Sequence, residues 1–241
     1  MAGKRKRAAA RHSNVVAGKA AAAATTVSAR LRRSETTAHD TYVVRVGDIH
    51  VVTTVTARPA VARPGGCAPR CGVTAAASAP APGSPSAWGA VEAAVPRARR
   101  RRPGTLQLCV GRRCLVFQIA RAAAANGVPA ALQRFLADNG VAFVGYGVRS
   151  DCRKLAAHHE GVRVACTREL RSVTGMGNAS MERMAEELLG LAGMKKPVTV
   201  SRSRWDAPKL SKKQVKYACV DAFLSLRLGV HVGVTPSSSS D

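Results

Sequence analysis

The sequence has few acidic residues and few aromatic residues. Its 241 residues include 14 Asp and Glu against 38 Lys and Arg, a formal net charge of +24, and only two Trp, three Tyr and four Phe. Such an excess of positive charge predicts attraction to polyanions, with nucleic acid first and an anionic membrane surface second. The length fits one sizeable domain with tails rather than two full domains.

Long apolar runs and paired cysteine motifs are also missing. No run reaches membrane-spanning length, and AGKAAAAATT is too short and too polar at its flanks for a secretory signal. The seven cysteines form no paired CxxC sets, and neither Cys67/Cys71 nor Cys109/Cys114 is followed by histidines at zinc spacing. We therefore expect a soluble intracellular protein with buried, reduced thiols and no membrane partner.

The positive charge is spread over tail and domain alike. Residues 1–33 hold nine Lys/Arg and no acid, and RARRRR at 97–102 adds five Arg. Residues 105–233 hold 20 basic and nine acidic residues, so the expected folded part is itself positive. A polyanion is therefore expected to meet the domain as well as the tail.

The N-terminal region predicts a disordered basic tail over residues 1–39, because it is rich in Ala, Arg and Ser and has no apolar period. KRKR at 4–7 resembles a short nuclear-import cluster, which predicts a nuclear and also possible cytoplasmic location. An organellar transit peptide is the rival interpretation, because the first acidic residue is Glu35.

Composition changes twice before residue 105. Residues 40–57 contain TYVVRVGDIHVVTTVT, whose alternating β-formers around Gly47-Asp48 predict a β-hairpin at the start of the domain. Residues 58–104 are dense in Pro, Gly, Ala and Arg and predict a low-complexity segment without regular structure. The serine-rich end, 234–241, predicts a second disordered tail.

Strands and helices alternate in residues 105–233, which predicts one α/β domain. Caps support several of the helices, including Ser150, Ser180 and a capping box formed by Ser211 and Gln214. The expected strands are 105–111, 113–120, 141–148 and 162–170, and the expected helices are 129–138, 150–161, 180–190 and 211–228.

The last expected helix carries a polar pair beside its apolar stripe. Val215, Ala218 and Cys219 recur at core spacing, whereas Tyr217 and Asp221 are one turn apart on a neighbouring face. A carboxylate beside a buried stripe is costly unless it is paired or metal-bound. Taken alone, such a pair is more commonly a solvated helix edge than half of a site.

The wider run resembles a known family. Trp205-Asp206, Leu210-Ser211, Gln214, Tyr217-Ala218 and Asp221-Ala222 resemble the third motif of DEDDy-type 3′→5′ exonucleases, a Tyr-x-x-x-Asp on a C-terminal helix. TLQLCVG with RCLVFQ, and FVGYGVRSDCRKL, resemble strands and the second motif of the Werner-type branch, particularly its small plant members. The resemblance implies a ribonuclease H-like α/β fold, a mixed sheet flanked by helices.

What the resemblance implies is hydrolysis of terminal phosphodiester bonds at the 3′ end of DNA or RNA. Asp151 and Asp221 would be metal ligands, and Tyr217 would orient the attacking water. Two Mg²⁺ or Mn²⁺ ions are expected, because hard cations take oxygen ligands and stabilise both reacting oxygens. The charge of Lys212, Lys213 and Lys216 suggests phosphate contacts, although a solvated helix face explains them equally. His158 and His159 are interpreted as surface residues.

The sequence departs from the family at its first motif, where the family has Gly-x-Asp-x-Glu on a strand. No aspartate occurs from residue 49 to residue 137, and Glu92, which aligns with the family's Glu, is the candidate metal ligand there. Natural loss would leave a nucleic-acid-binding pseudo-exonuclease. A shifted reading frame over 58–104 would also give this composition. The sequence does not choose between DNA and RNA and does not fix the oligomeric state.

Overall fold

The structure is a computed structural model, and it describes residues 23–32, 39–60, 88–94, 103–125 and 127–234. The KRKR cluster at 4–7, most of the segment 58–104 and the tail beyond residue 234 lie outside these residues. Within the described ranges, none of the helices combines the length and the apolar character that a membrane span requires.

One mixed sheet of eight strands organises the described residues, in the order β1-β2-β3-β6-β5-β4-β7-β8. Pairing is antiparallel except at β3–β6, β4–β7 and β7–β8, which are parallel. The strands are β1 Val27–Arg32, β2 Asp40–Val46, β3 Ile49–Thr56, β4 Trp88–Ala94, β5 Thr105–Val110, β6 Arg113–Phe117, β7 Ala142–Gly145 and β8 Cys166–Glu169. The mixed sheet expected from the sequence is confirmed.

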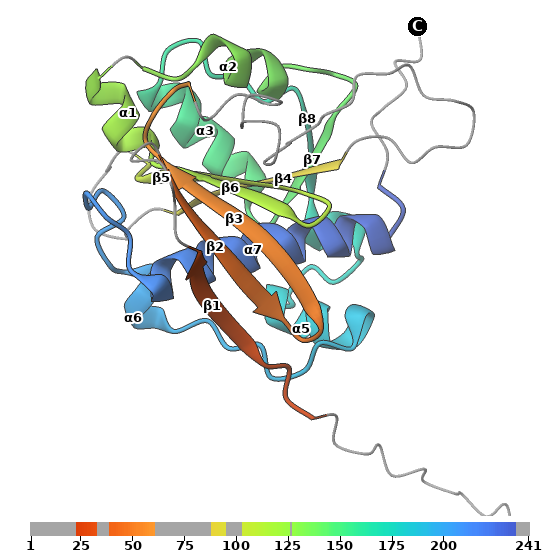
Figure 1. Cartoon of the computed structure of the whole chain (residues 1–241). Helices are drawn as coiled ribbons and strands as arrows, with labels where there is room; N and C mark the ends of the chain where they lie inside the picture. Colours follow the sequence, from red (N-terminus) through yellow and green to blue (C-terminus); the bar gives the residue numbers. More distant parts are fainter. Residues whose placement is uncertain (1–22, 33–38, 61–87, 95–102, 126, 235–241) are drawn as a thin grey trace, which may run out of the picture.

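Helices cover both faces of this sheet (Figure 1). One core cluster joins the long α7 and α5 to one face, and a second joins α1, α2 and α3 to the other. The helices are α1 Ile119–Ala125, α2 Ala130–Leu136, α3 Val148–His158, α4 Leu170–Val173, α5 Met181–Leu189, α6 Val198–Ser201 and α7 Lys212–His231. The long axis of α7 therefore runs beneath most of the sheet.

Strand β4 corrects the prediction that residues 58–104 lack regular structure. Trp88–Ala94 lies at an inner position of the sheet, pairing antiparallel with β5 and parallel with β7. Its alanines and its arginine-rich surroundings give no strand pattern locally, so the strand depends on hydrogen bonds to two neighbours that are specified elsewhere. The strand that the sequence pattern did not predict is therefore present in the fold, between β5 and β7.

The N-terminal region is also more ordered than predicted. The hairpin of β2 and β3 is confirmed, with Gly47 at a positive φ of 56° in its turn. Residues 27–32, expected to belong to a disordered tail, form β1, which pairs antiparallel with β2. Alternate residues of β1 face the core side, and Val27 and Ala29 pack against the cluster beneath α7.

Helix starts follow the predicted caps in two of three cases. Ser180 caps α5, and the Ser211–Gln214 capping box opens α7. The cap predicted at Ser150 is wrong, because α3 begins two residues earlier, after Gly147 at a φ of 77°. The strand expected over 113–120 ends at Phe117, and residues 119–125 form α1 instead.

Candidate active site

Two buried carboxylates from different helices form the centre of the candidate site. Asp151 lies in the first turn of α3 and is 7% exposed, and Asp221 lies within α7 and is 4% exposed. Burial raises the pKa of the Asp221 carboxyl above its usual range, and the negative charges of Glu182 and Asp151 raise it further. The structure thus brings Asp151 and Asp221 within electrostatic range of each other.

A lysine that the sequence analysis missed compensates Asp221. The ammonium group of Lys196 forms an ion pair with Asp221 Oδ1, and its charge opposes the rise in the pKa of that carboxyl. The Lys196 side chain is 16% exposed, and its Nζ also lies 3.5 Å from the sulfur of Met181. Lys196 precedes Pro197 in the segment between α5 and α6, so no helical or strand spacing links it to Asp221.

Asp151 has a cationic neighbour on its own helix. Lys154 Nζ donates to Asp151 Oδ1 at 3.1 Å, one turn further along α3. The lysine side chain is 39% exposed, so solvent screens this pair more than the pair at Asp221. Each of the two carboxylates therefore already has a cationic partner in the protein.

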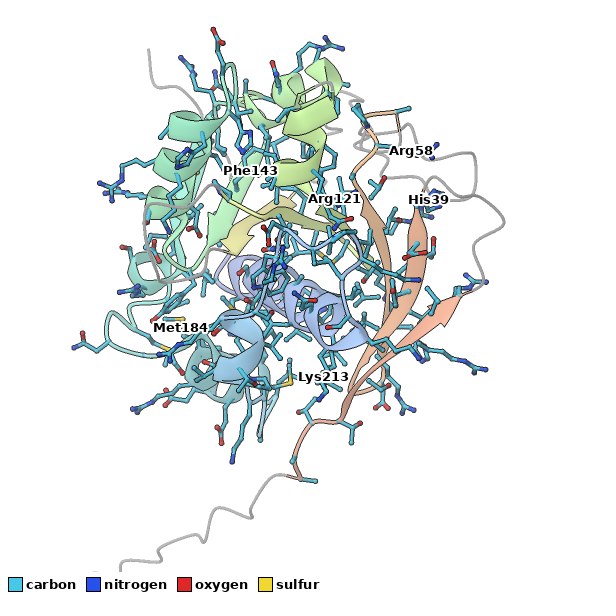
Figure 2. All side chains as sticks on the ribbon, turned by 90° about the vertical axis from the view of Figure 1, so that its left-hand side faces the viewer. His39, Arg58, Arg121, Phe143, Met184 and Lys213 are labelled. Atoms are coloured by element: carbon cyan, nitrogen blue, oxygen red, sulfur yellow. The ribbon has the colours of Figure 1, made fainter. Side chains whose placement is uncertain are left out.

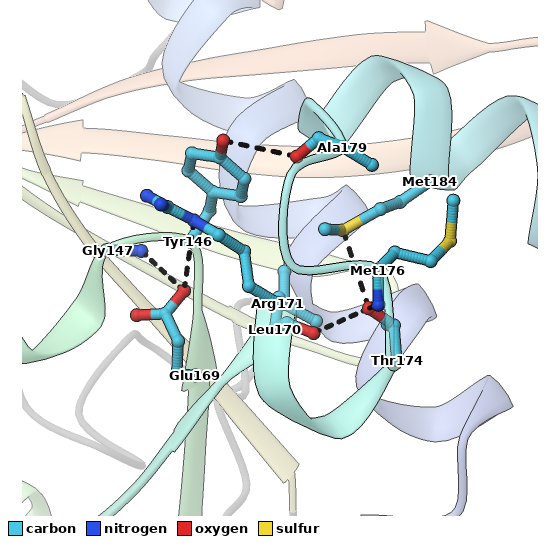
Figure 3. Close-up of polar contacts among 9 residues, drawn as sticks. All are labelled: Tyr146, Gly147, Glu169, Leu170, Arg171, Thr174, Met176, Ala179 and Met184. Carbon is cyan, nitrogen blue, oxygen red and sulfur yellow. Dashed lines mark hydrogen bonds and ion pairs between the residues drawn. The ribbon is translucent and has the colours of Figure 1, made fainter.

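The start of α3 is fixed by residues outside the predicted motifs (Figure 3). The backbone N–H of Gly147 donates to Glu169 Oε1 at 2.9 Å, at the point where the helix begins. Arg171 Nε lies 3.9 Å from the same oxygen, and its guanidinium lies 4.3 Å from the centre of the Tyr146 ring. Tyr146 in turn donates its hydroxyl to the carbonyl of Ala179 at 3.2 Å. This network holds the turn that carries Asp151.

Tyr217 lies one turn before Asp221 on α7, as expected. Its half-buried ring packs edge-on against Trp205 at a centroid distance of 5.8 Å, and Lys196 Nζ lies 5.8 Å from its centre. Trp205 is 1% exposed and donates its indole N–H to the Ser201 carbonyl at 3.2 Å. Trp205 and Lys196 therefore both lie close to the tyrosine ring and limit its orientations.

A pocket of about 340 Å³ opens beside Tyr217 and Lys196. Lys195, Lys196, Lys213 and Lys216 line it together with Tyr217, and Glu182 adds one carboxylate. Of the three lysines predicted to contact phosphate, Lys213 and Lys216 line this pocket, whereas Lys212 is exposed and does not. The pocket joins an apolar floor, which includes Val220 and Leu224, to several cationic groups.

The register of β4 shows on which face of the sheet Glu92, the remaining predicted metal ligand, lies. Glu92 pairs with Gln107, and Ala90 pairs with Cys109, whose side chain belongs to the core cluster beneath α7. Residues paired directly across two strands lie on the same face of a sheet. Positions 90 and 92 are therefore on the α7 face, and alanine stands two residues before the glutamate.

The donor chemistry of the two carboxylates fits a divalent cation. Carboxylate oxygens suit Mg²⁺, which commonly takes one or two protein carboxylates and completes its shell with water and substrate phosphate. Asp151 and Asp221 provide such a pair. In the part of the chain that the structure describes, no group of three or more His, Cys, Asp or Glu side chains could hold a metal.

Two smaller predictions had different outcomes. His159 was expected at the surface, but it is 5% exposed at the end of α3, so that prediction is wrong; His158 is half-buried. Among the described cysteines, Cys109, Cys114 and Cys219 are free and buried, as expected for reduced thiols, and burial raises the pKa of Cys109 and of Cys114.

Several known proteins are similar to this chain in sequence or in fold. A 3′-5′ exonuclease of Arabidopsis thaliana is 29% identical over 135 residues, which are 52% of this chain and 43% of the relative, so the chain spans less than half of that protein. NrnC of Brucella melitensis matches in fold with a TM-score of 0.51 at 21% identity, covering 60% of this chain and 71% of the other. The EXD2 exonuclease domain soaked in Mn and Mg is a weaker likeness, with a TM-score of 0.34 at 23% identity, covering 60% and 75%.

The family model for 3′-5′ exonuclease matches residues 96–231, more than half of the chain. The matched range begins just after β4 and contains α3, α7 and both buried carboxylates. Its fold is the ribonuclease H-like arrangement of a mixed sheet between helices. The chain belongs to the DEDD-type 3′-5′ exonuclease family.

Proposed function

We propose that the chain hydrolyses the terminal phosphodiester bond at the 3′ end of a DNA or RNA strand, with a divalent cation held by Asp151 and Asp221. The observation that carries the proposal is the convergence of these two buried carboxylates from α3 and α7, with Tyr217 one turn away. Burying two like charges near each other is costly, and a bound cation offsets that cost.

Each residue has a separate role in this proposal. Asp151 and Asp221 would hold Mg²⁺ or Mn²⁺, which would offset the negative charge that develops on the phosphoryl oxygens. Tyr217 would orient the attacking water, and its contacts with Trp205 and Lys196 restrict its ring. Lys213 and Lys216 would contact substrate phosphates from the neighbouring pocket.

The number of bound cations depends on the carboxylates that β4 provides. Two ions were expected from the family resemblance, and a second ion would need Glu92 and a further carboxylate on β4. The register puts Ala90 where that carboxylate would stand. We therefore propose that one ion binds and that hydrolysis is slow.

The alternative function is nucleic-acid binding without hydrolysis. Two observations favour it: Ala90 on β4, and the ion pairs that already place Lys196 on Asp221 and Lys154 on Asp151. In this case the lysine-lined pocket would bind a 3′ end, and the two carboxylates would contribute to stability through their ion pairs. The two functions differ in whether the bound strand becomes shorter.

The test is incubation of purified protein with 5′-labelled single-stranded and 3′-recessed oligonucleotides in Mg²⁺, in Mn²⁺ and in EDTA. Stepwise shortening that stops in EDTA and in Asp221→Asn supports the enzyme. Asp206→Asn is the matched control, because Asp206 is an exposed acid paired only at 3.6 Å with exposed Arg204. Salt-sensitive binding without shortening supports the alternative.

We also propose that the protein is nuclear, because the basic cluster KRKR at 4–7 resembles a nuclear-import signal. A fluorescent protein fused to residues 1–22 should accumulate in nuclei, and Lys/Arg→Ala changes at 4–7 should disperse it. Accumulation in an organelle would instead support the transit-peptide interpretation.

A further inference from the structure

Four strands, β1 to β4, lie outside the range that the exonuclease family model matches, and three of them, β1, β2 and β3, form one end of the sheet. The match begins at residue 96, whereas β1, β2 and β3 end at Thr56. They extend the sheet beyond β6, with β3 parallel to β6 and the three strands antiparallel to one another, so they add a surface next to the family fold rather than a separate domain. Nothing in the candidate active site accounts for this surface.

The two faces of this extension differ in chemistry. One face packs beneath α7 through the buried side chains of Tyr42, Val44, Val46, Val51 and Val55. On the other face, Ser28, Arg45 and His50 stand opposite one another across the three strands, and all three are exposed. Figure 2 shows these strands at one edge of the molecule, with side chains that extend away from α7.

The open face is basic along the strand as well as across it. Arg30 and Arg32 alternate with the inward residues of β1 and are exposed, and their Cα atoms are roughly 7 Å apart by strand geometry. With Arg45 and His50 they line a groove of about 660 Å³. None of its described lining residues is acidic.

Asp48 pairs with Arg45 at the end of this face, and it does not neutralise the groove. It lies in the β2–β3 turn, fully exposed, and accepts from Arg45 Nη2 at 3.3 Å. An exposed pair of this kind contributes little and is easily exchanged for another anion. Arg113, the register partner of Val52 on β6, continues the basic face toward the family fold.

We infer that the open face of β1, β2 and β3 binds the phosphate backbone of the nucleic-acid strand whose 3′ end occupies the candidate active site. The inference rests on the proposed function for the identity of the polyanion. Arginine suits phosphate because its planar guanidinium donates two parallel hydrogen bonds. Val27 of the edge strand β1 lines the lysine pocket, and its neighbour Ser28 lines the groove on the opposite face. A long strand that passes around this edge would contact both, so we expect the face to act on long substrates and not on short ones.

The experiment compares two triple variants with the same change in charge. The face variant is Arg30→Gln, Arg32→Gln, Arg45→Gln, and the control is Arg134→Gln, Arg163→Gln, Arg227→Gln, whose three arginines are exposed elsewhere. Binding of labelled single-stranded oligonucleotides of 30 and 6 nucleotides would be measured by fluorescence anisotropy in EDTA, from low to moderate KCl. Without metal, binding is tested separately from hydrolysis.

The face variant should bind the long oligonucleotide about tenfold more weakly than the control at moderate salt, with a salt slope smaller by roughly 2, as expected when three phosphate contacts are lost. Binding of the short oligonucleotide should be equal in both variants. Equal affinity of the two variants for the long strand overturns the inference, even if the wild type shortens it. Loss of binding to phosphatidylserine vesicles with unchanged oligonucleotide binding also overturns it. If the face variant binds the long oligonucleotide more weakly but the wild type does not shorten it with metal, only the proposed hydrolysis is overturned.

Discussion

At the scale of single residues, the site depends on how Asp221 is compensated. Its carboxyl has a pKa raised first by burial, and Lys196 opposes the rise. A raised pKa in the folded state means that stability is greatest where the group is protonated and falls as the pH rises through the folded pKa. Lys196 limits that loss by stabilising the ionised carboxylate.

Lys196→Met should therefore destabilise the protein in a pH-dependent way. Removing one partner of a buried pair costs about 3 kcal/mol at neutral pH, because Asp221 is left charged and uncompensated. The pKa of Asp221 should rise further, so the loss should shrink at acidic pH, where the carboxyl is protonated. Urea unfolding in EDTA at pH 4.5 and pH 7.5 measures this. Exposed Lys195→Met is the control, and a loss that is equal at both pH values would contradict the assignment.

Cys152, next to Asp151 on α3, should be a poorly reactive thiol. Burial, and then the charge of Asp151, raise its pKa from the model-compound value of 9.0 to about 11. The thiolate is the reactive form, so alkylation by iodoacetamide at pH 8 should be slow in the native protein and fast after unfolding. Peptide mass spectrometry follows this residue separately. Rapid native labelling of Cys152 would show that the first turn of α3 is not packed as described.

At the scale of elements, Gly104, which precedes β5, packs so closely against Trp205 that we expect it not to tolerate a side chain. A Cβ added at Gly104 would lie 2.6 Å from Trp205 Cβ and 2.9 Å from its backbone carbon, so the backbone itself must move. Gly104→Ala should cost about 1–3 kcal/mol through overpacking. Gly177→Ala is the control, because a Cβ there meets nothing within 4 Å. Urea titration measures the free energy of unfolding of both variants. Equal stability of the two would contradict the close packing of Gly104 against Trp205.

The elements also show where sequence patterns were sufficient. The β2–β3 hairpin and the caps of α5 and α7 follow from residues within a few positions, since turn and cap chemistry are local. Strand β4 carries no such signal, because its pairing with β5 and β7 is supplied by the rest of the sheet.

The site divides in the same manner. Asp151, Tyr217 and Asp221 could be selected from their motif spacing and the family resemblance. Lys196 and Glu169 could not, because each acts on a residue more than 20 positions away across a loop. Such contacts depend on the packing of α5, β8 and α7, which no local period encodes.

At the scale of the whole molecule, the chain keeps the family fold and two of the carboxylates that the proposed cation site needs. Helices α3 and α7 bring their carboxylates together, and β4 runs beneath α7 with alanine at position 90. The central claim is that this centre hydrolyses 3′ ends slowly because it lacks one carboxylate on that strand. An added carboxylate should then increase the rate.

The most direct test is the rate of shortening of a 5′-labelled single-stranded oligonucleotide in Mn²⁺ by the wild type and by Ala90→Asp. The account predicts slow shortening by the wild type and shortening at least about tenfold faster by Ala90→Asp, equivalent to about 1.4 kcal/mol of transition-state stabilisation. The increase should disappear in Ala90→Asp combined with Asp221→Asn. A folded Ala90→Asp variant that is no faster than the wild type would contradict the account.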